Sequence, residues 1–155
     1  MPEDVMRGDI MNVGVSTADE AEITLLIKNH FEGMRWTRDT SPDWKRFSSD
    51  FLPGASLFPA ARPVQIRTLE AFIERMNGVA ARTLHTFEEH TLGMQILVFG
   101  HIAVVLAASE MLENETETNH DISAYLLVKN EGKWLIAAHA WDKPTPERPV
   151  PDYLR

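Results

Sequence analysis

Two histidines in this sequence combine acid–base chemistry with apolar neighbours. His139 alternates with Leu135, Ala137 and Trp141 in a strand-length run, which predicts that all four lie on one face. Because those neighbours are apolar, His139 is expected to be enclosed, either in a pocket or in a subunit interface. His85 stands between a helical pattern and the apolar runs that follow it. A neutral imidazole with a pKa of about 6.5 suits general acid–base catalysis, so both histidines are catalytic candidates.

Two further polar side chains stand among apolar residues. Tyr125 is predicted to share a strand face with Ser123 and Leu127. A buried tyrosine hydroxyl can polarise a substrate carbonyl, or it can make one hydrogen bond within the core. His30 follows Leu26 by four residues, which places it on the apolar face of a helix. It is interpreted as a buried, hydrogen-bonded imidazole, with a place in a ligand-binding pocket as the alternative.

Four aromatic residues are candidates for the wall or mouth of such a pocket, and core packing is the alternative for each. They are Trp36, Trp44, Phe58 and Trp141.

Metal and cofactor motifs are not apparent. The run from His85 to His90 contains donor types, including Glu88, but it is not the HExxH arrangement, and there is no cysteine to complete a zinc site. The acidic residues from Glu110 to Asp121 lack calcium-loop spacing and are interpreted as a solvated hairpin tip. We therefore expect no metal and no cofactor, and no acid among the inward-facing positions.

Length, charge and composition limit the classes of protein that fit. A chain of 155 residues with 44% apolar residues fits one globular domain. The formal charge of −8 and the lack of clustered Lys and Arg argue against nucleic-acid binding. No apolar stretch approaches about 18 residues, so no membrane span is predicted. The N-terminus does not read as a secretory signal, and a cytoplasmic location is the expectation.

The predicted elements run from helices to strands. A capping box at Thr17–Glu20 begins a first helix, and Thr68 caps a later one whose apolar face includes Phe72 and Met76. A proline-rich tail at 144–155 is expected to lie over the subunit surface, and residues 1–16 read as a flexible arm. The domain itself is predicted at 17–143. The other predicted elements are a short helix at 43–51 and strands at 55–58, 64–66, 92–99, 102–112, 122–128 and 134–141.

The order of these elements resembles the nuclear-transport-factor-2-like superfamily, in its SnoaL-like and ketosteroid-isomerase-like branches. The resemblance rests on Asp43-Trp44, the run from Phe47 to Phe51, the run from Val98 to Val105, and Lys133-Trp134 through Trp141. It implies an α+β fold in which a cone-shaped, curved antiparallel sheet is closed by three helices from the N-terminal half (a cystatin-like α+β barrel). It also implies an apolar pocket and a homodimer formed through the outer face of the sheet.

One departure from the family pattern limits what the resemblance implies. Phe58 stands where the ketosteroid-isomerase-like pattern has a proton-abstracting aspartate, and no acid lies between Phe51 and Leu69. The leading hypothesis is a pocket for a small hydrophobic molecule, with isomerase-, cyclase- or dehydratase-type proton transfer by His85 or His139 and with Tyr125 as the orienting group. The alternative is a non-catalytic dimeric binding or assembly module. The sequence leaves open whether the protein is an enzyme.

Overall fold

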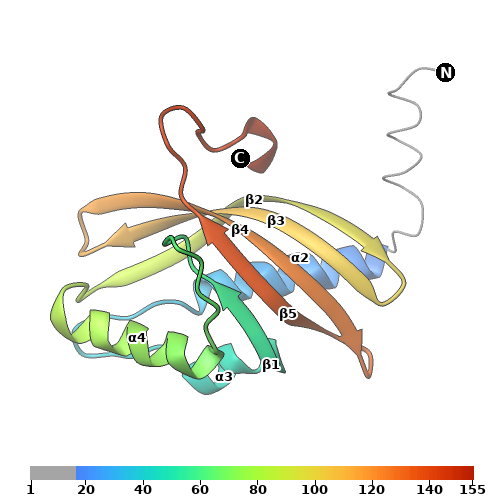
Figure 1. The fold of residues 1–155 in the computed structure, drawn as a ribbon, viewed down its shortest axis with the longest axis horizontal. Helices are drawn as coiled ribbons and strands as arrows, with labels where there is room; N and C mark the ends of the chain where they lie inside the picture. The colour runs from blue at the N-terminus through green and yellow to red at the C-terminus, as the bar shows by residue number, and fades with distance from the viewer. Residues whose placement is uncertain (1–16) are drawn as a thin grey trace.

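The computed structural model describes residues 17–155, so the predicted arm at 1–16 lies outside the described residues (Figure 1). The helices precede four of the five strands, as predicted. The elements are α2 (Thr17–Glu32), α3 (Trp44–Ser48), β1 (Phe51–Phe58), α4 (Leu69–Arg82), β2 (Phe87–Phe99), β3 (Ile102–Glu113), β4 (Glu117–Asn130), β5 (Lys133–Asp142) and the 3-10 turn η1 (Asp152–Leu154).

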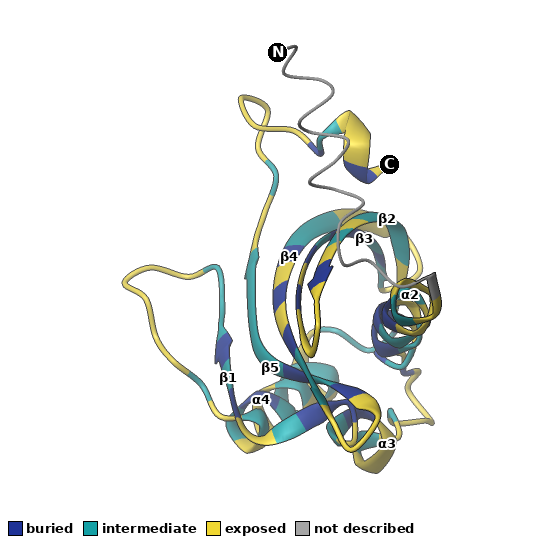
Figure 2. Cartoon of the chain, turned by 90° about the vertical axis from the view of Figure 1, so that its right-hand side faces the viewer, coloured by how far each residue is buried: buried dark blue, intermediate teal, exposed yellow. Residues whose placement is uncertain are grey.

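The five strands form one curved sheet in the order β1-β5-β4-β3-β2. β2 to β5 pair antiparallel in chain order, which is the predicted meander, and β1 adds to the edge parallel to β5. The sheet curls without closing, and α2 lies against its concave side (Figure 2). The predicted α+β cone is therefore confirmed, with one parallel edge strand and an open rim.

α2 buries its apolar stripe inside the cone. Ile23, Ile27 and Phe31 recur at four-residue steps and are 0, 0 and 3% exposed. The helix is also tied to the far hairpin, because Asp19 Oδ1 accepts hydrogen bonds from Lys129 Nζ at 2.9 Å and Trp134 Nε1 at 3.0 Å. These two donors hold the pKa of Asp19 below its usual range. α2 is thus fixed in place at its start and along its length.

The shorter helices begin at the predicted caps. The Asp43 side chain accepts from the backbone N–H of Arg46 at the start of α3, and Thr68 accepts from that of Ala71 at the start of α4. The predicted strand at 64–66 is wrong: only Arg67 pairs there, in an isolated bridge to Leu57. Proline at 59 and 63 removes backbone donors that a ladder needs, which accounts for the loop.

A bulge in β5 changes which side chains face the interior. The β4–β5 register shifts between Leu126/Ala138 and Leu127/Ile136, which leaves Ala137 as an extra residue. As a result Trp134 and Ile136 are buried before the bulge, and His139 lines the interior after it. The predicted alternation that put Leu135 on the face of His139 is therefore wrong, since it assumed an unbroken period of two.

The C-terminal segment packs on the outer face of the sheet. Leu154 is 0% exposed and Val150 is 8% exposed, and both belong to a small buried cluster with Ala108. The segment comes so close to β2 that a Cβ at Gly93 would stand 2.7 Å from the Leu154 carbonyl carbon. The β2–β3 register shifts between Thr91 and Gly93, so the strand is irregular at this point. Among the described residues, no helix combines the length and apolar character needed to span a bilayer.

Candidate functional site

The candidate site is a cavity of about 220 Å³ between the concave face of the sheet, α2 and α4. Its walls are mostly apolar and partly aromatic, as suits a small organic ligand. The apolar lining comes from every layer of the fold: Phe31, Met34, Phe47, Leu57, Phe72, Met76, Leu84, Phe87, Met111 and Trp141.

One side of the cavity is formed by His30, which is paired with the buried Asp50. His30 Nδ1 lies 2.9 Å from Asp50 Oδ2, and the two residues are 3% and 7% exposed. Because a carboxylate only accepts, the ring hydrogen belongs on Nδ1. Phe47 stacks on the imidazole at 4.4 Å between ring centroids and fixes its plane. No described residue offers a hydrogen bond to Nε2, which leaves that nitrogen available to a molecule in the cavity.

A second histidine lies on the opposite, sheet side of the cavity. His139 Nε2 is 3.0 Å from Ser123 Oγ, and its ring stacks on Tyr125 at 4.2 Å between centroids. Burial, and to a smaller extent the charge of His30, lower the pKa of His139 well below its ordinary value. His139 is therefore neutral at physiological pH, and the stack holds the Tyr125 ring in place.

The Tyr125 hydroxyl is a buried polar group without a hydrogen bond. Tyr125 is 2% exposed, and its oxygen has no hydrogen-bond partner among residues 17–155. Burial raises the pKa of this phenol well above 10, and the Glu89 carboxyl adds to the effect, while Ser123 opposes it weakly without completing a hydrogen bond. Leaving such a group unpaired costs about 1–3 kcal/mol. The hydroxyl is thus free to bind a ligand.

Carboxyl groups line one end of the cavity, which corrects the expectation of no inward-facing acid. Glu89, Glu113 and Asp121 all face it, and Lys143 lies at their edge. Glu89 Oε2 accepts from Ser109 Oγ at 2.7 Å, yet burial still raises the pKa of Glu89 to about 8. Asp121 Oδ1 lies 3.2 Å from Lys143 Nζ, but burial outweighs that charge and raises the pKa of Asp121.

Four of the residues predicted from sequence come together here. His30, Tyr125, His139 and Trp141 all line the cavity. His85 does not: it borders a surface hollow, because the Asn114 side chain accepts from the His85 backbone N–H at 2.8 Å and Leu84 takes the inward position.

The other three aromatic candidates lie elsewhere. Trp36 is core packing, stacked on Phe87 at 4.7 Å between centroids. Trp44 donates to Asn77 at 3.0 Å on the flank of α4. Phe58 lies on the outer face of the sheet.

Asp50, Glu89 and Asp121 are the site residues that sequence reasoning missed. Asp50 directly precedes Phe51, and so lies just outside the segment from Phe51 to Leu69 that contains no acid. Glu89 has a sequence signal, because it alternates with the buried Phe87 and stands opposite Met111 in the ladder. The prediction that Asp121 belongs to a hairpin tip is wrong. The turn spans only 114–116, and Asp121 lies within β4, which begins at Glu117.

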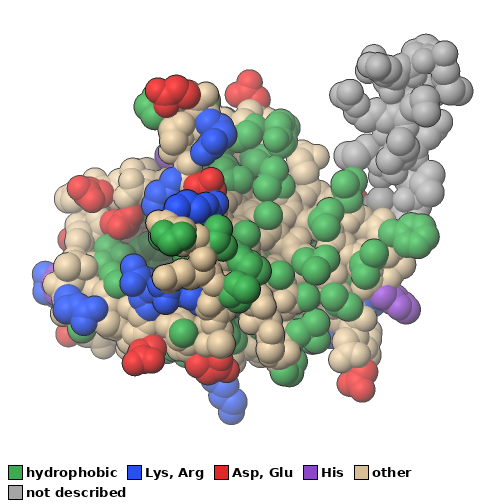
Figure 3. Space-filling model, viewed as in Figure 1, with side chains coloured by type: hydrophobic (Ala, Val, Ile, Leu, Met, Phe, Trp, Pro, Cys, Tyr) green, Lys and Arg blue, Asp and Glu red, His purple; other side chains and the backbone are tan. Residues whose placement is uncertain are grey.

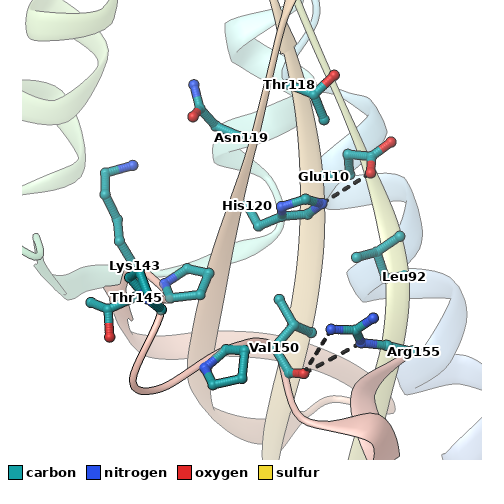
Figure 4. A pocket seen from close by; sticks show the side chains of 12 residues that line it. Leu92, Glu110, Thr118, Asn119, His120, Lys143, Thr145, Val150 and Arg155 are labelled. Carbon is teal, nitrogen blue, oxygen red and sulfur yellow. Dashed lines mark hydrogen bonds and ion pairs between the residues drawn. The ribbon is translucent and has the colours of Figure 1, made fainter.

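A larger hollow of about 640 Å³ lies on the other side of the sheet, under the C-terminal segment (Figure 4). Its charged groups are already paired: His120 Nε2 lies 3.0 Å from Glu110 Oε2, and the Arg155 guanidinium donates to the Val150 carbonyl at 3.2 Å. Within residues 17–155 no three His, Asp or Glu side chains are grouped to hold a metal ion. The unpaired Tyr125 hydroxyl lines the smaller cavity and not this hollow, which makes the smaller cavity the stronger candidate.

Replacing Tyr125 with phenylalanine is expected to leave the fold intact and to raise the free energy of unfolding by about 1 kcal/mol, because an unpaired buried hydroxyl is removed. Urea unfolding measures this difference. Ser123→Ala is the contrasting variant, since it breaks the hydrogen bond to His139 and should lower stability. A Tyr125→Phe protein less stable than the parent would show that the hydroxyl has a partner.

Comparison with known proteins identifies solved structures that have a similar fold. No family model matches the sequence, and no curated protein matches it either. Solved structures do match: a nuclear-transport-factor-2-like protein of unknown function from Pseudomonas putida has a TM-score of 0.68 and 16% identity, over 92% of this chain and 99% of the other. A hexachlorocyclohexane dehydrochlorinase, LinA-type3, from Novosphingobium barchaimii has a TM-score of 0.65 and 14% identity, over 83% and 88%.

A third match is a protein assigned as a scytalone dehydratase from Novosphingobium aromaticivorans, with a TM-score of 0.63 and 11% identity over 83% of this chain and 85% of the other. The chain therefore has the nuclear-transport-factor-2-like, or cystatin-like, fold. This confirms the resemblance seen in the sequence at the level of fold.

Proposed function

We propose that this protein binds a small, largely apolar molecule in the cavity and catalyses proton transfer on it, as in the elimination of water or halide or in an isomerisation. The observation that carries the proposal is His30 on the cavity wall, held by the buried Asp50. A carboxylate that fixes Nδ1–H leaves Nε2 as the nitrogen that can accept a proton. The dehydratase and dehydrochlorinase among the structural neighbours support the same type of reaction, since both names describe eliminations.

The remaining groups have complementary roles in this proposal. His30 Nε2 takes a proton from carbon, and Asp50 stabilises the imidazolium that forms. The Tyr125 hydroxyl donates a hydrogen bond to a carbonyl or leaving-group oxygen, because it has no partner in the protein. His139 stays neutral and positions Tyr125 by stacking. His85 has no role in the proposal because it lies outside the cavity.

The test is carbon–hydrogen exchange with solvent. A panel of cyclic ketones, cyclohexanols and chlorinated cyclohexanes is incubated with the protein in deuterated water, and NMR follows deuterium uptake and any elimination product. His30→Gln should lower the rate of the responding compound by about 10²–10⁴-fold, the usual contribution of a general base. His101→Gln, in the exposed β2–β3 turn, is the matched control.

Two outcomes of this test contradict the proposal. If the His30→Gln variant still catalyses deuterium exchange, the general base is a residue other than His30. A panel member that binds but never exchanges favours the alternative, a non-catalytic binding or assembly module.

The same proposal includes a homodimer formed through the outer face of the sheet. Large apolar side chains spread over this face, which is turned toward the viewer in Figure 3. None of the described residues covers them, and a contiguous exposed apolar surface marks an interaction site. They are Leu97, Phe99, Ile102, Val104 and Leu126, between 44 and 71% exposed.

Val104→Glu is expected to convert the dimer to a monomer, because it buries a carboxylate against the apolar face of the second copy. Light scattering coupled to size-exclusion chromatography measures the change. Thr116→Glu, in the β3–β4 turn, carries the same added charge and should remain dimeric. A wild-type protein that is monomeric at high micromolar concentration would contradict the dimer.

A further inference from the structure

The acidic end of the cavity contains more carboxyl groups than ammonium groups. Glu89, Glu113 and Asp121 face the cavity there, and Lys143 is the one ammonium on the described lining. Their burial is also unequal: the Lys143 side chain is 63% exposed, whereas that of Asp121 is 14% exposed. The carboxyls thus lie inside, while their counter-charge lies in the solvent at the mouth.

The neighbouring Tyr125 hydroxyl is a second, independent sign of a missing partner. It is 2% exposed, lines the same cavity, and has no hydrogen bond to any described residue. Its pKa responds to Glu89, so the two groups act on the same region of the cavity. A hydroxyl oxygen and carboxylate oxygens can all accept hydrogen bonds, and only an N–H or O–H donor satisfies them together.

We propose that this end of the cavity is a subsite for the ammonium group of an amine-bearing ligand, held by Glu89 and Asp121 and by the Tyr125 oxygen. The inference rests on the proposed function, because it assigns a substrate class to the same cavity. An ammonium supplies three hydrogen-bond donors and a positive charge that can pair with the Glu89 carboxylate. The rings of Phe87 and Trp141 add faces that attract a cation. The remaining apolar walls hold the carbon skeleton.

A protonated Glu89 gives the subsite a distinctive dependence on pH. Burial raises the pKa of Glu89 to about 8, so the empty site holds a proton at neutral pH. A bound ammonium favours the carboxylate and releases that proton, so affinity for the amine should increase as pH rises toward 8 and then level off. A neutral ligand that accepts from the carboxylic acid should show the opposite trend. The other titratable groups on the cavity wall are His30, Glu113, Asp121, Tyr125, His139 and Lys143.

The experiment uses three ligands with the same ring: cyclohexylmethylamine, cyclohexylmethanol and cyclohexanecarboxylate. An alkylamine keeps its charge up to pH 9, like a lysine side chain with a pKa of about 10.4. Calorimetric titration at pH 6.5, 7.5 and 8.5 should show that the amine binds at least tenfold more tightly than the alcohol. Its affinity should rise by up to about tenfold per pH unit below 8, with a proton released to buffer. The carboxylate ligand should not bind.

The matched variants are Glu89→Gln and Glu88→Gln on the same strand. Glu89→Gln should lose the pH dependence and at least tenfold in amine affinity, while its affinity for the alcohol stays the same. Glu88→Gln should match the parent, because the Glu88 side chain is 48% exposed and faces away from the cavity. Proton release by the wild-type protein gives a readout that needs no variant.

Three outcomes separate this inference from the proposed function. Equal binding of alcohol and amine at every pH overturns the amine subsite and leaves the cavity in place. Failure of all three ligands to bind overturns both. Amine binding that persists in His30→Gln, with no exchange into solvent by either protein, supports the subsite and contradicts the catalytic role.

Discussion

Glu89→Gln is expected to stabilise the fold increasingly as pH rises. The folded-state pKa of Glu89 is raised from 4.5 to about 8. Below pH 4.5 both the folded and unfolded chains hold the proton, so parent and variant should be about equally stable. Between pH 4.5 and 8 only the unfolded chain loses it, so the parent loses stability as pH rises and then levels off. At about 1.4 kcal/mol per pKa unit, the difference above pH 8 is roughly 3–5 kcal/mol in favour of glutamine.

Urea unfolding at pH 5, 7 and 9 measures this difference directly. The raised pKa of Asp121 acts in the same direction and the lowered pKa of His139 acts below pH 6.5, but both are common to parent and variant. Glu88→Gln is the control and should give no pH-dependent difference. A parallel pair of stability curves for Glu89→Gln and parent would show that Glu89 is ionised in the folded protein.

The second large effect is expected from Gly93→Ala. The new Cβ would lie 2.7 Å from the carbonyl carbon and 2.8 Å from the carbonyl oxygen of Leu154, so the C-terminal segment must move off β2. Leu154 is 0% exposed, and losing its burial together with part of that of Val150 should cost about 2–4 kcal/mol. Thermal unfolding measures the loss, and limited proteolysis should cut the segment near 144–150.

Gly78→Ala in α4 is the matched control for Gly93→Ala. Its Cβ meets only the end of the flexible Arg82 side chain, at 3.0 Å, and alanine favours a helix by about 0.5–1 kcal/mol over glycine. It should therefore be neutral or stabilising. Leu154→Ala should lower stability nearly as much as Gly93→Ala, and the double variant should add little, because both act on one contact. Full additivity would contradict the contact between Gly93 and Leu154.

The sequence was sufficient for the order and type of most elements because those depend on local patterns. The Thr68 cap and the alternation of Ser123 with Tyr125 and Leu127 both reappear as predicted. Where such a period continues unbroken, the sequence also indicates which side chains are enclosed, whereas His139 and Trp141 line the cavity although the alternation that grouped them with Leu135 is broken at Ala137. His30 and Tyr125 therefore came out correctly as members of enclosed faces.

The missed parts of the site depend on contacts between distant residues. Asp50 belongs to the site only because it contacts His30, twenty positions earlier in the chain. From its neighbours in the chain, Glu89 is expected to be solvated. Only the pairing of β3 with β2 brings Ser109 to its carboxyl group. The neighbours of His85 in the chain suggest a catalytic position, but its backbone N–H donates to the side chain of Asn114, which is 29 positions away. No local period contains these relationships.

The extra residue at Ala137 makes the site depend on strand register as well as on side-chain identity. Trp134 and Ile136 point inward before the bulge, and His139 and Trp141 point inward after it. An unbroken ladder that kept Ala137 would turn the last two side chains to the convex face, with their identities unchanged. Two related chains could therefore share every residue discussed here and differ in whether they have a working cavity, through the presence of the bulge alone. Comparison of relatives should accordingly begin with the register of β5 against β4.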